Sequence, residues 1–145
     1  MERFTVIPAV HVFLFRNSNV LLLRRYQTGY QDGNYSVPAG HMDGGETVKQ
    51  AAIREVHEEC GIDIAPCDLI IGAVMHRKSD SERIDFFLEA HQWSGVISNQ
   101  EPDKCDDLRW FSTDHLPTNL IPYVRYGLES VLRNDTWFLE FGWKQ

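Results

Sequence analysis

Four glutamates, one arginine and two glycines stand at short, regular spacings between residues 40 and 62 of this chain. In order they are Gly40, Glu46, Arg54, Glu55, Glu58, Glu59 and Gly61. Hard divalent cations such as Mg²⁺ and Mn²⁺ prefer oxygen ligands and commonly bind through a few carboxylates opposite the phosphates of a substrate. The segment therefore indicates a divalent-metal site for phosphate chemistry.

The residues between Glu46 and Gly61 are expected to form a helix of roughly fifteen residues. No proline interrupts them, alanines occupy positions 51 and 52, and Gly61 stands where a left-handed residue would end a helix. At about 100° per residue, one face of this helix carries the three carboxylates of Glu55, Glu58 and Glu59. An adjoining apolar stripe is expected to pack on a core: Ile53, Val56 and Cys60.

Three like charges on one helix face repel one another, and each i,i+4 pair costs a few tenths of a kcal/mol. A bound cation would compensate for this repulsion, and Arg54 can fix one of the carboxylates through a bidentate pair. The alternative is an ordinary solvated acidic face, which would explain the run Glu-Val-His-Glu-Glu taken alone. The glycines and Glu46 standing in register with that run favour the metal site.

The complete pattern is G-x5-E-x7-R-E-U-x-E-E-x-G-U, where U is aliphatic, and it runs from Gly40 to Ile62. It resembles the signature of the Nudix (MutT-type) hydrolases at every fixed position. The resemblance implies an α/β fold, an α/β/α sandwich around a mixed β-sheet. It also implies Mg²⁺-dependent hydrolysis of a nucleoside diphosphate linked to another group, with Mn²⁺ as the alternative ion.

By the same resemblance, single residues of this segment receive roles. The expected metal ligands are the Gly40 carbonyl and the carboxylates of Glu55, Glu58 and Glu59. The expected supporting pair, which would hold the loop and the helix together, is Glu46 and Arg54.

Attack by water also needs a carboxylate that takes its proton. The first candidates are Glu58 and Glu59, and the sequence does not decide between them. Related enzymes sometimes recruit this base from a loop after the signature, which makes Glu101 a third candidate. The competing interpretation of Glu101 is a solvated turn carboxylate before Pro102.

A second informative region spans residues 99–111. Its residues E-P-x-K-C-x4-W-F resemble, more weakly, a segment of Nudix enzymes that act on nucleoside triphosphates. Asp106 and Asp107 are candidates to accept hydrogen bonds from an amino-bearing base, although a charged turn entering a strand would look the same. Arg24 and Arg25, at the end of an expected strand, are candidate phosphate contacts, with ordinary exposed strand arginines as the alternative. Three aromatic residues are candidates either to stack on a base or to pack internally: Tyr30, Tyr35 and Trp110.

Length and composition agree with one domain over residues 1–145, which are 43% hydrophobic and 24% charged. The formal charge of −7 argues against a sequence-independent grip on nucleic-acid backbone, so the expected partner is a small nucleotide. Three scattered cysteines without C-x-x-C spacing indicate free thiols. No signal peptide or apolar run of membrane-spanning length is seen, so a cytoplasmic, membrane-free protein is expected, as a monomer or a homodimer.

Hydrophobic patterns predict where the elements lie. Strands are expected over residues 4–15 and 20–25 as a hairpin, over 68–76 and 83–93 as a second hairpin, and over 108–112. A glycine-rich loop is expected over 27–35, a helix over 123–133, and a packed tail over 137–141.

The leading functional interpretation is a nucleotide pyrophosphatase. It would cleave a nucleoside triphosphate or a modified nucleotide to a nucleoside monophosphate and pyrophosphate. The alternatives are a pyrophosphatase for ADP-ribose or another nucleoside diphosphate conjugate, and a non-catalytic ligand-binding module, against which the intact carboxylates argue.

Overall fold

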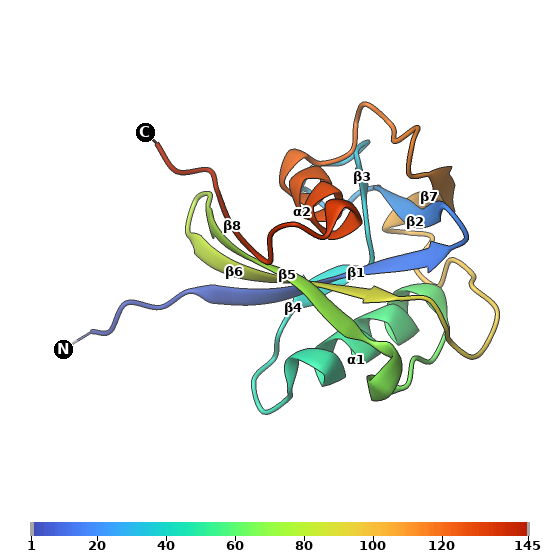
Figure 1. Cartoon of the computed structure of the whole chain (residues 1–145), viewed down its shortest axis with the longest axis horizontal. Coiled ribbons are helices and arrows are strands. Elements are labelled where there is room, and N and C mark those ends of the chain that lie inside the picture. The colour runs from blue at the N-terminus through green and yellow to red at the C-terminus, as the bar shows by residue number, and fades with distance from the viewer. Residues whose placement is uncertain (1, 145) are drawn as a thin grey trace.

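The computed structural model describes residues 2–144, and its elements are a mixed β-sheet with one helix on each face (Figure 1). Their order along the chain is β1 (Ile7–Arg16), β2 (Asn19–Arg25), β3 (Tyr35–Ser36), β4 (Ala39–His41), α1 (Val48–Cys60), the 3-10 turn η1 (Pro66–Asp68), β5 (Ile70–Lys78), β6 (Glu82–Ala90), β7 (Cys105–Ser112), α2 (Pro122–Arg133) and β8 (Phe138–Phe141).

Strand β1 lies at the centre of the sheet. Hydrogen-bonded neighbours in the sheet follow the order β3-β2-β1-β6-β5-β8, and in addition β4 pairs with β1 and β7 pairs with β2. β1 is parallel to β6 and antiparallel to β2 and β4, so the sheet is mixed. Alternate side chains of β1 pack into two hydrophobic cores, one on each face of the sheet, because successive residues of a strand point to opposite faces. Phe13 packs with α2 residues on one face, and Val12 packs with α1 residues on the other.

Helix α1 is shorter than expected, with 13 residues that begin at Val48. The difference arises at its N-terminus, where Thr47 is the N-cap and exchanges hydrogen bonds with Gln50 in a capping box. Glu46 therefore lies before the helix, not in its first turn. At the other end Gly61 has φ 72° and caps the helix in the left-handed conformation, as the sequence predicted.

Helix α2 begins one residue earlier than the expected 123–133. It contains Gly127, which intrinsic propensity disfavours inside a helix. Packing explains this glycine, because a Cβ at Gly127 would lie 2.7 Å from the ring of Phe87 in β6. The glycine therefore allows α2 to lie close against the sheet.

Both expected hairpins are present with shifted ends. The turn of the second spans only 79–81, because β5 and β6 continue to Lys78 and from Glu82. Strand β7 starts at Cys105, three residues before the expected 108–112, because it pairs with β2 as far as Arg25. The expected packed tail is the edge strand β8, which pairs in parallel with β5 and buries Leu139.

Candidate active site

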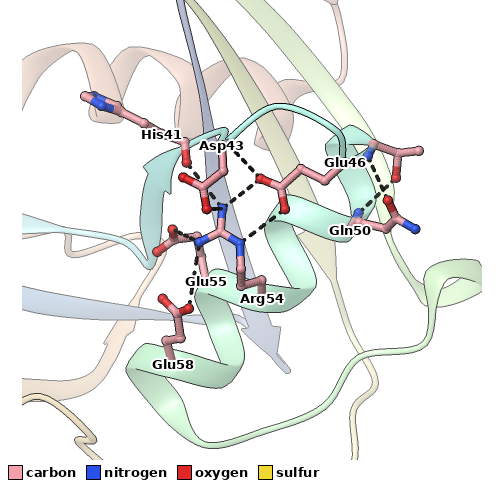
Figure 2. A network of polar contacts seen from close by, with 8 residues as sticks. His41, Asp43, Glu46, Gln50, Arg54, Glu55 and Glu58 are labelled. Carbon is pink, nitrogen blue, oxygen red and sulfur yellow. Dashed lines mark hydrogen bonds and ion pairs between the residues drawn. The ribbon is translucent and has the colours of Figure 1, made fainter.

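Arg54 lies at the centre of a polar network that joins the loop after β4 to helix α1 (Figure 2). Its Nε and Nη2 donate to the two carboxylate oxygens of Glu46 at 3.2 and 2.8 Å. Its Nη1 donates to Glu55 Oε1 at 2.7 Å, and its Nη2 also reaches the His41 carbonyl at 3.3 Å. Glu46 in turn accepts the backbone N–H of Asp43 at 2.9 Å. One guanidinium thus fixes the loop, the helix start and a carboxylate of the acidic face.

The charges in this network shift one another's ionisation. The hydrogen bonds from Arg54 lower the pKa of Glu46, and those of Glu46 raise the pKa of Arg54. Burial raises the pKa of Glu55, and this effect outweighs the opposing influence of Arg54. The network therefore stabilises Glu46 as an anion. A further positive charge would be required to do the same for the carboxylate of Glu55.

Gly40 and Glu55 are in direct contact. A Cβ at position 40 would lie 2.2 Å from the carboxylate of Glu55, so only glycine leaves room for that carboxylate against the β4 backbone. The contact places the carboxylate of Glu55 against β4, where the Gly40 carbonyl is the expected backbone ligand. This is the kind of mixed donor set that hard divalent ions prefer.

Glu59 is the least accessible carboxylate of the acidic face. Its Oε2 accepts the backbone N–H of Ala39 at 3.1 Å. Burial raises the pKa of Glu59 well above its usual range, and the nearby charge of Glu55 raises it further. A cation beside these two carboxylates would reverse that trend and stabilise both as anions.

A cavity of about 510 Å³ opens over this face of α1. Glu55, Glu58 and Glu59 line it together with Glu101, from the loop before β7. The structure therefore brings all three candidate bases to one cavity. Glu58 is the most open of the helix carboxylates, with 51% of its side chain exposed, and lies 3.8 Å from Arg54 Nη1.

The donor set fits a divalent cation, although no three acidic, histidine or cysteine side chains of residues 2–144 already surround a single ion position. The fit rests on the Gly40–Glu55 contact and on the buried, mutually repelling carboxylates of Glu55 and Glu59. Candidate ligands are the Gly40 carbonyl and the carboxylates of Glu55, Glu58 and Glu59.

Three residues that the sequence nominated for substrate binding lie elsewhere. Arg24 Nε donates to Asp106 Oδ1 at 2.7 Å, and Asp107 accepts from the Tyr35 hydroxyl and from Arg109 Nε. Asp106 and Asp107 line another cavity beside Trp110, which shares Asn99 and Leu108 with the cavity over α1. The structure pairs these charges within the protein, and their contact with substrate stays a prediction.

Lys104 and Asn99 line the cavity and were not singled out by the sequence. Arg25, a candidate phosphate contact together with Arg24, also lines it and is held by the loop after β2 through the Tyr30 carbonyl at 2.7 Å and Thr28 Oγ1 at 3.0 Å. Strand alternation puts Arg24 and Arg25 on opposite sides. The bulge between these two residues could not be read from the sequence.

The model of the NUDIX domain matches residues 5–132 of this chain. With the complete signature in β4, α1 and the loop between them, and a mixed sheet between two helices, this match shows that the chain belongs to the Nudix family. Among solved structures, the MutT NUDIX hydrolase from Burkholderia pseudomallei has a TM-score of 0.81 at 28% identity, covering 88% of this chain and 98% of that one.

Two relatives of this chain are named for different activities. The NAD-capped RNA hydrolase NudC of Pseudomonas aeruginosa (strain LESB58) is 37% identical over 110 residues, 76% of this chain and 37% of that protein. The 8-oxo-dGTP diphosphatase of Proteus vulgaris is 30% identical over 102 residues, 70% of this chain and 89% of that protein. The chain therefore spans less than two fifths of the NudC protein and most of the diphosphatase.

Proposed function

We propose that this chain uses Mg²⁺, or Mn²⁺ in its place, to hydrolyse the pyrophosphate linkage of a nucleoside triphosphate or modified nucleotide, giving a nucleoside monophosphate and pyrophosphate. The observation that carries the proposal is the cavity over α1. It combines four carboxylates, from Glu55, Glu58, Glu59 and Glu101, with the cationic side chains of Arg25 and Lys104. Carboxylates can hold the cation, and the basic side chains can contact phosphate oxygens.

The proposed roles divide between support and chemistry. Arg54 and Glu46 hold the Gly40 loop and orient Glu55 through the bonds described above. A bound divalent cation would neutralise phosphate charge and lower the pKa of a coordinated water. One of Glu58, Glu59 and Glu101 would take the proton of the attacking water.

A second candidate is cleavage of a nucleoside diphosphate conjugate such as ADP-ribose or NAD. The similarity to NudC, which is named as an NAD-capped RNA hydrolase, favours this alternative. The aligned length favours hydrolysis of a triphosphate or modified nucleotide, because the 8-oxo-dGTP diphosphatase is matched over most of its length. The net charge of −7 favours a free nucleotide over an RNA chain in both cases. In the described chain, no helix is long and apolar enough to cross a membrane.

We also propose that residues 1–145 form one domain, since both helices pack on the same sheet. A substrate panel tests the activity. The four dNTPs and 8-oxo-dGTP are assayed for phosphate with and without added pyrophosphatase, and ADP-ribose and NAD for monophosphates released to alkaline phosphatase. Pyrophosphate release from a triphosphate supports the first candidate, and cleavage of the conjugates alone supports the second.

Glu59→Gln is the low-activity control for the panel, and Glu140→Gln on the exposed part of β8 is its matched neutral variant. Activity that is equal in Glu59→Gln and wild type would come from a contaminant or from another site. No turnover of any panel member by the wild-type chain in Mg²⁺ or Mn²⁺ would overturn the proposal.

A further inference from the structure

A second cavity, of about 520 Å³, adjoins the first on the α2 side of the sheet. The two share Arg25 and Ala39 as lining residues. A ligand bound in the first cavity by its phosphates can therefore extend past Arg25 into the second. Ala9 of β1 contributes only a methyl group to the lining, and Tyr30 and Tyr123 contribute aromatic rings, so the cavity suits a flat ring.

A buried charged pair lies behind this cavity. Arg77 of β5 donates to Asp85 of β6 through Nε at 2.6 Å and Nη2 at 3.2 Å, and these side chains are 6% and 0% exposed. The guanidinium also lies over the ring of Tyr123, 3.7 Å from its centre. Arg77 therefore balances the charge of Asp85 inside the protein.

His11 of β1 completes the arrangement. Its Nε2 lies 3.0 Å from Asp85 Oδ1, and its ring stacks on Phe87 with a centroid distance of 4.9 Å. Ionised Asp85 can only accept, so the proton of the imidazole lies on Nε2. A ring that carries this one proton on Nε2 presents Nδ1 as an acceptor.

Nδ1 of His11 is buried and has no hydrogen-bond partner among residues 2–144. A buried acceptor left unsatisfied costs about 1–3 kcal/mol, so native proteins seldom keep one without a reason. His11 lines the second cavity while only 3% exposed, which means that its ring is recessed behind the cavity wall. A group that projects from a flat ring can reach such an acceptor better than the ring edge itself.

We propose that His11 is a specificity-determining residue whose Nδ1 accepts a hydrogen bond from an NH₂ group projecting from the ring of the substrate. The NH₂ group comes either from the exocyclic amine of a nucleobase or from a ring carboxamide. Asp85 and Arg77 are positioning residues, because they fix the tautomer of His11. This inference rests on the proposed function only in that the ring belongs to the substrate cleaved in the first cavity.

The test measures binding without turnover. Dissociation constants are determined by isothermal titration calorimetry in EDTA for pairs of mononucleotides that differ by the NH₂ group. The pairs are GMP and IMP, AMP and purine riboside monophosphate, CMP and its 4-deamino analogue, and nicotinamide and nicotinic acid mononucleotides. In the preferred pair we expect the wild type to bind the NH₂ member at least about tenfold more tightly, because a built hydrogen-bond site rejects an analogue that lacks the donor.

Two variants locate the effect. His11→Gln retains a donor near Asp85 and loses the acceptor at the Nδ1 position, so the preference should fall to less than about threefold. His115→Gln, on an exposed turn outside both cavities, should keep the wild-type preference. If His11→Gln does not fold, the wild-type comparison of the pairs decides alone.

The outcomes are distinct from those of the proposed function. Equal binding within every pair, no binding of any mononucleotide, or a preference that survives in folded His11→Gln would overturn the role of His11. A wild-type chain that shows the binding preference but hydrolyses no pyrophosphate would instead refute the proposed activity. A preference in the nucleobase pairs assigns the NH₂ group to a base, and one in the nicotinamide pair assigns it to a carboxamide.

Discussion

The carboxylate of Glu55 occupies the space that a side chain at Gly40 would need, with a virtual Cβ at 2.2 Å from its carbon and Oε1. This contact ties the loop of the signature to the helix of the signature. It explains in steric terms why a glycine stands at the first position of the pattern. Arg54 holds the same carboxylate from its other side at 2.7 Å.

Gly40→Ala should therefore reduce activity without unfolding the protein. The new methyl group would displace Glu55, and we expect kcat to fall by about 10²-fold, the order seen when a key electrostatic group is lost. Gly127→Ala is the matched control, because its Cβ would strike Phe87 in the core and should lower the melting temperature instead. Steady-state kinetics and thermal unfolding of both variants check this. A fully active Gly40→Ala would show that the position of Glu55 is unimportant.

Two substitutions of Arg54 should distinguish the effect of its charge from the effect of its hydrogen-bond geometry. Arg54→Lys keeps a positive charge but cannot donate to both oxygens of Glu46 and to Glu55 together. We expect Arg54→Ala to lower both metal affinity and melting temperature, and Arg54→Lys to recover only part of each. Metal titrations followed by activity, with thermal unfolding beside them, provide the comparison. If Arg54→Lys has the metal affinity and the melting temperature of the wild type, the forked geometry of the guanidinium is dispensable.

Activity should require added Mg²⁺ or Mn²⁺ and vanish in excess EDTA, because hard divalent cations prefer the carboxylate oxygens that line the cavity over α1. Glu58→Gln, Glu59→Gln and Glu101→Gln separate the base from the ligands. Loss of a ligand should be partly rescued by raising the metal concentration, whereas loss of the base should lower kcat at every concentration, by at least about 10²-fold. Turnover that persists in EDTA would contradict the metal site.

How far the sequence predicts this site depends on whether a contact is local or distant. Glu55, Glu58 and Glu59 share a face because helical geometry alone places them there. The pairing of Arg54 with Glu46 came from the family resemblance, since a loop conformation lies between them. The contribution of Asp43 and the His41 carbonyl to Arg54 depends on that loop and was not predicted.

Distant pairings account for what was missed. His11 and Asp85 are 74 positions apart in the sequence and meet because β1 and β6 are parallel neighbours, a pairing that no local pattern predicts. The same holds for Gly127, where a core contact with Phe87 overrides poor helix propensity. The ion pair of Arg24 with Asp106 also depends on the distant β2–β7 pairing and was not predicted.

The buried Asp85 should make stability depend on acid pH. Burial raises the pKa of Asp85, but the hydrogen bonds from His11 and Arg77 outweigh this, and the net pKa is lowered from 3.8. A lowered pKa means that the contribution is complete at neutral pH and is lost as the pH falls through 3.8 towards the folded-state value. Denaturant unfolding should show a larger gap between wild type and Asp85→Asn at pH 7 than at pH 3. A constant gap would contradict the lowered pKa.

Asp106 and Asp107 give the clearest test of a sequence hypothesis against geometry. If they recognise the base, Asn variants should change the ratio of kcat/KM between nucleotides by about 1–3 kcal/mol. Their bonds to Arg24, Tyr35 and Arg109 already satisfy these carboxylates within the protein and favour a different result. We expect this ratio across the dNTPs and 8-oxo-dGTP to stay within about threefold in both variants, under 1 kcal/mol.

Stability should distinguish the two aspartates. Asp106 pairs with Arg24 at the surface, where both side chains are over a third exposed, so Asp106→Asn should cost less than about 1 kcal/mol. Asp107 is 26% exposed and accepts from the hydroxyl of the buried Tyr35, so Asp107→Asn should lower the melting temperature more. Thermal unfolding of both variants beside the kinetic panel checks this. A large change in nucleotide preference with an unchanged melting temperature would instead support the hypothesis that both residues recognise the base.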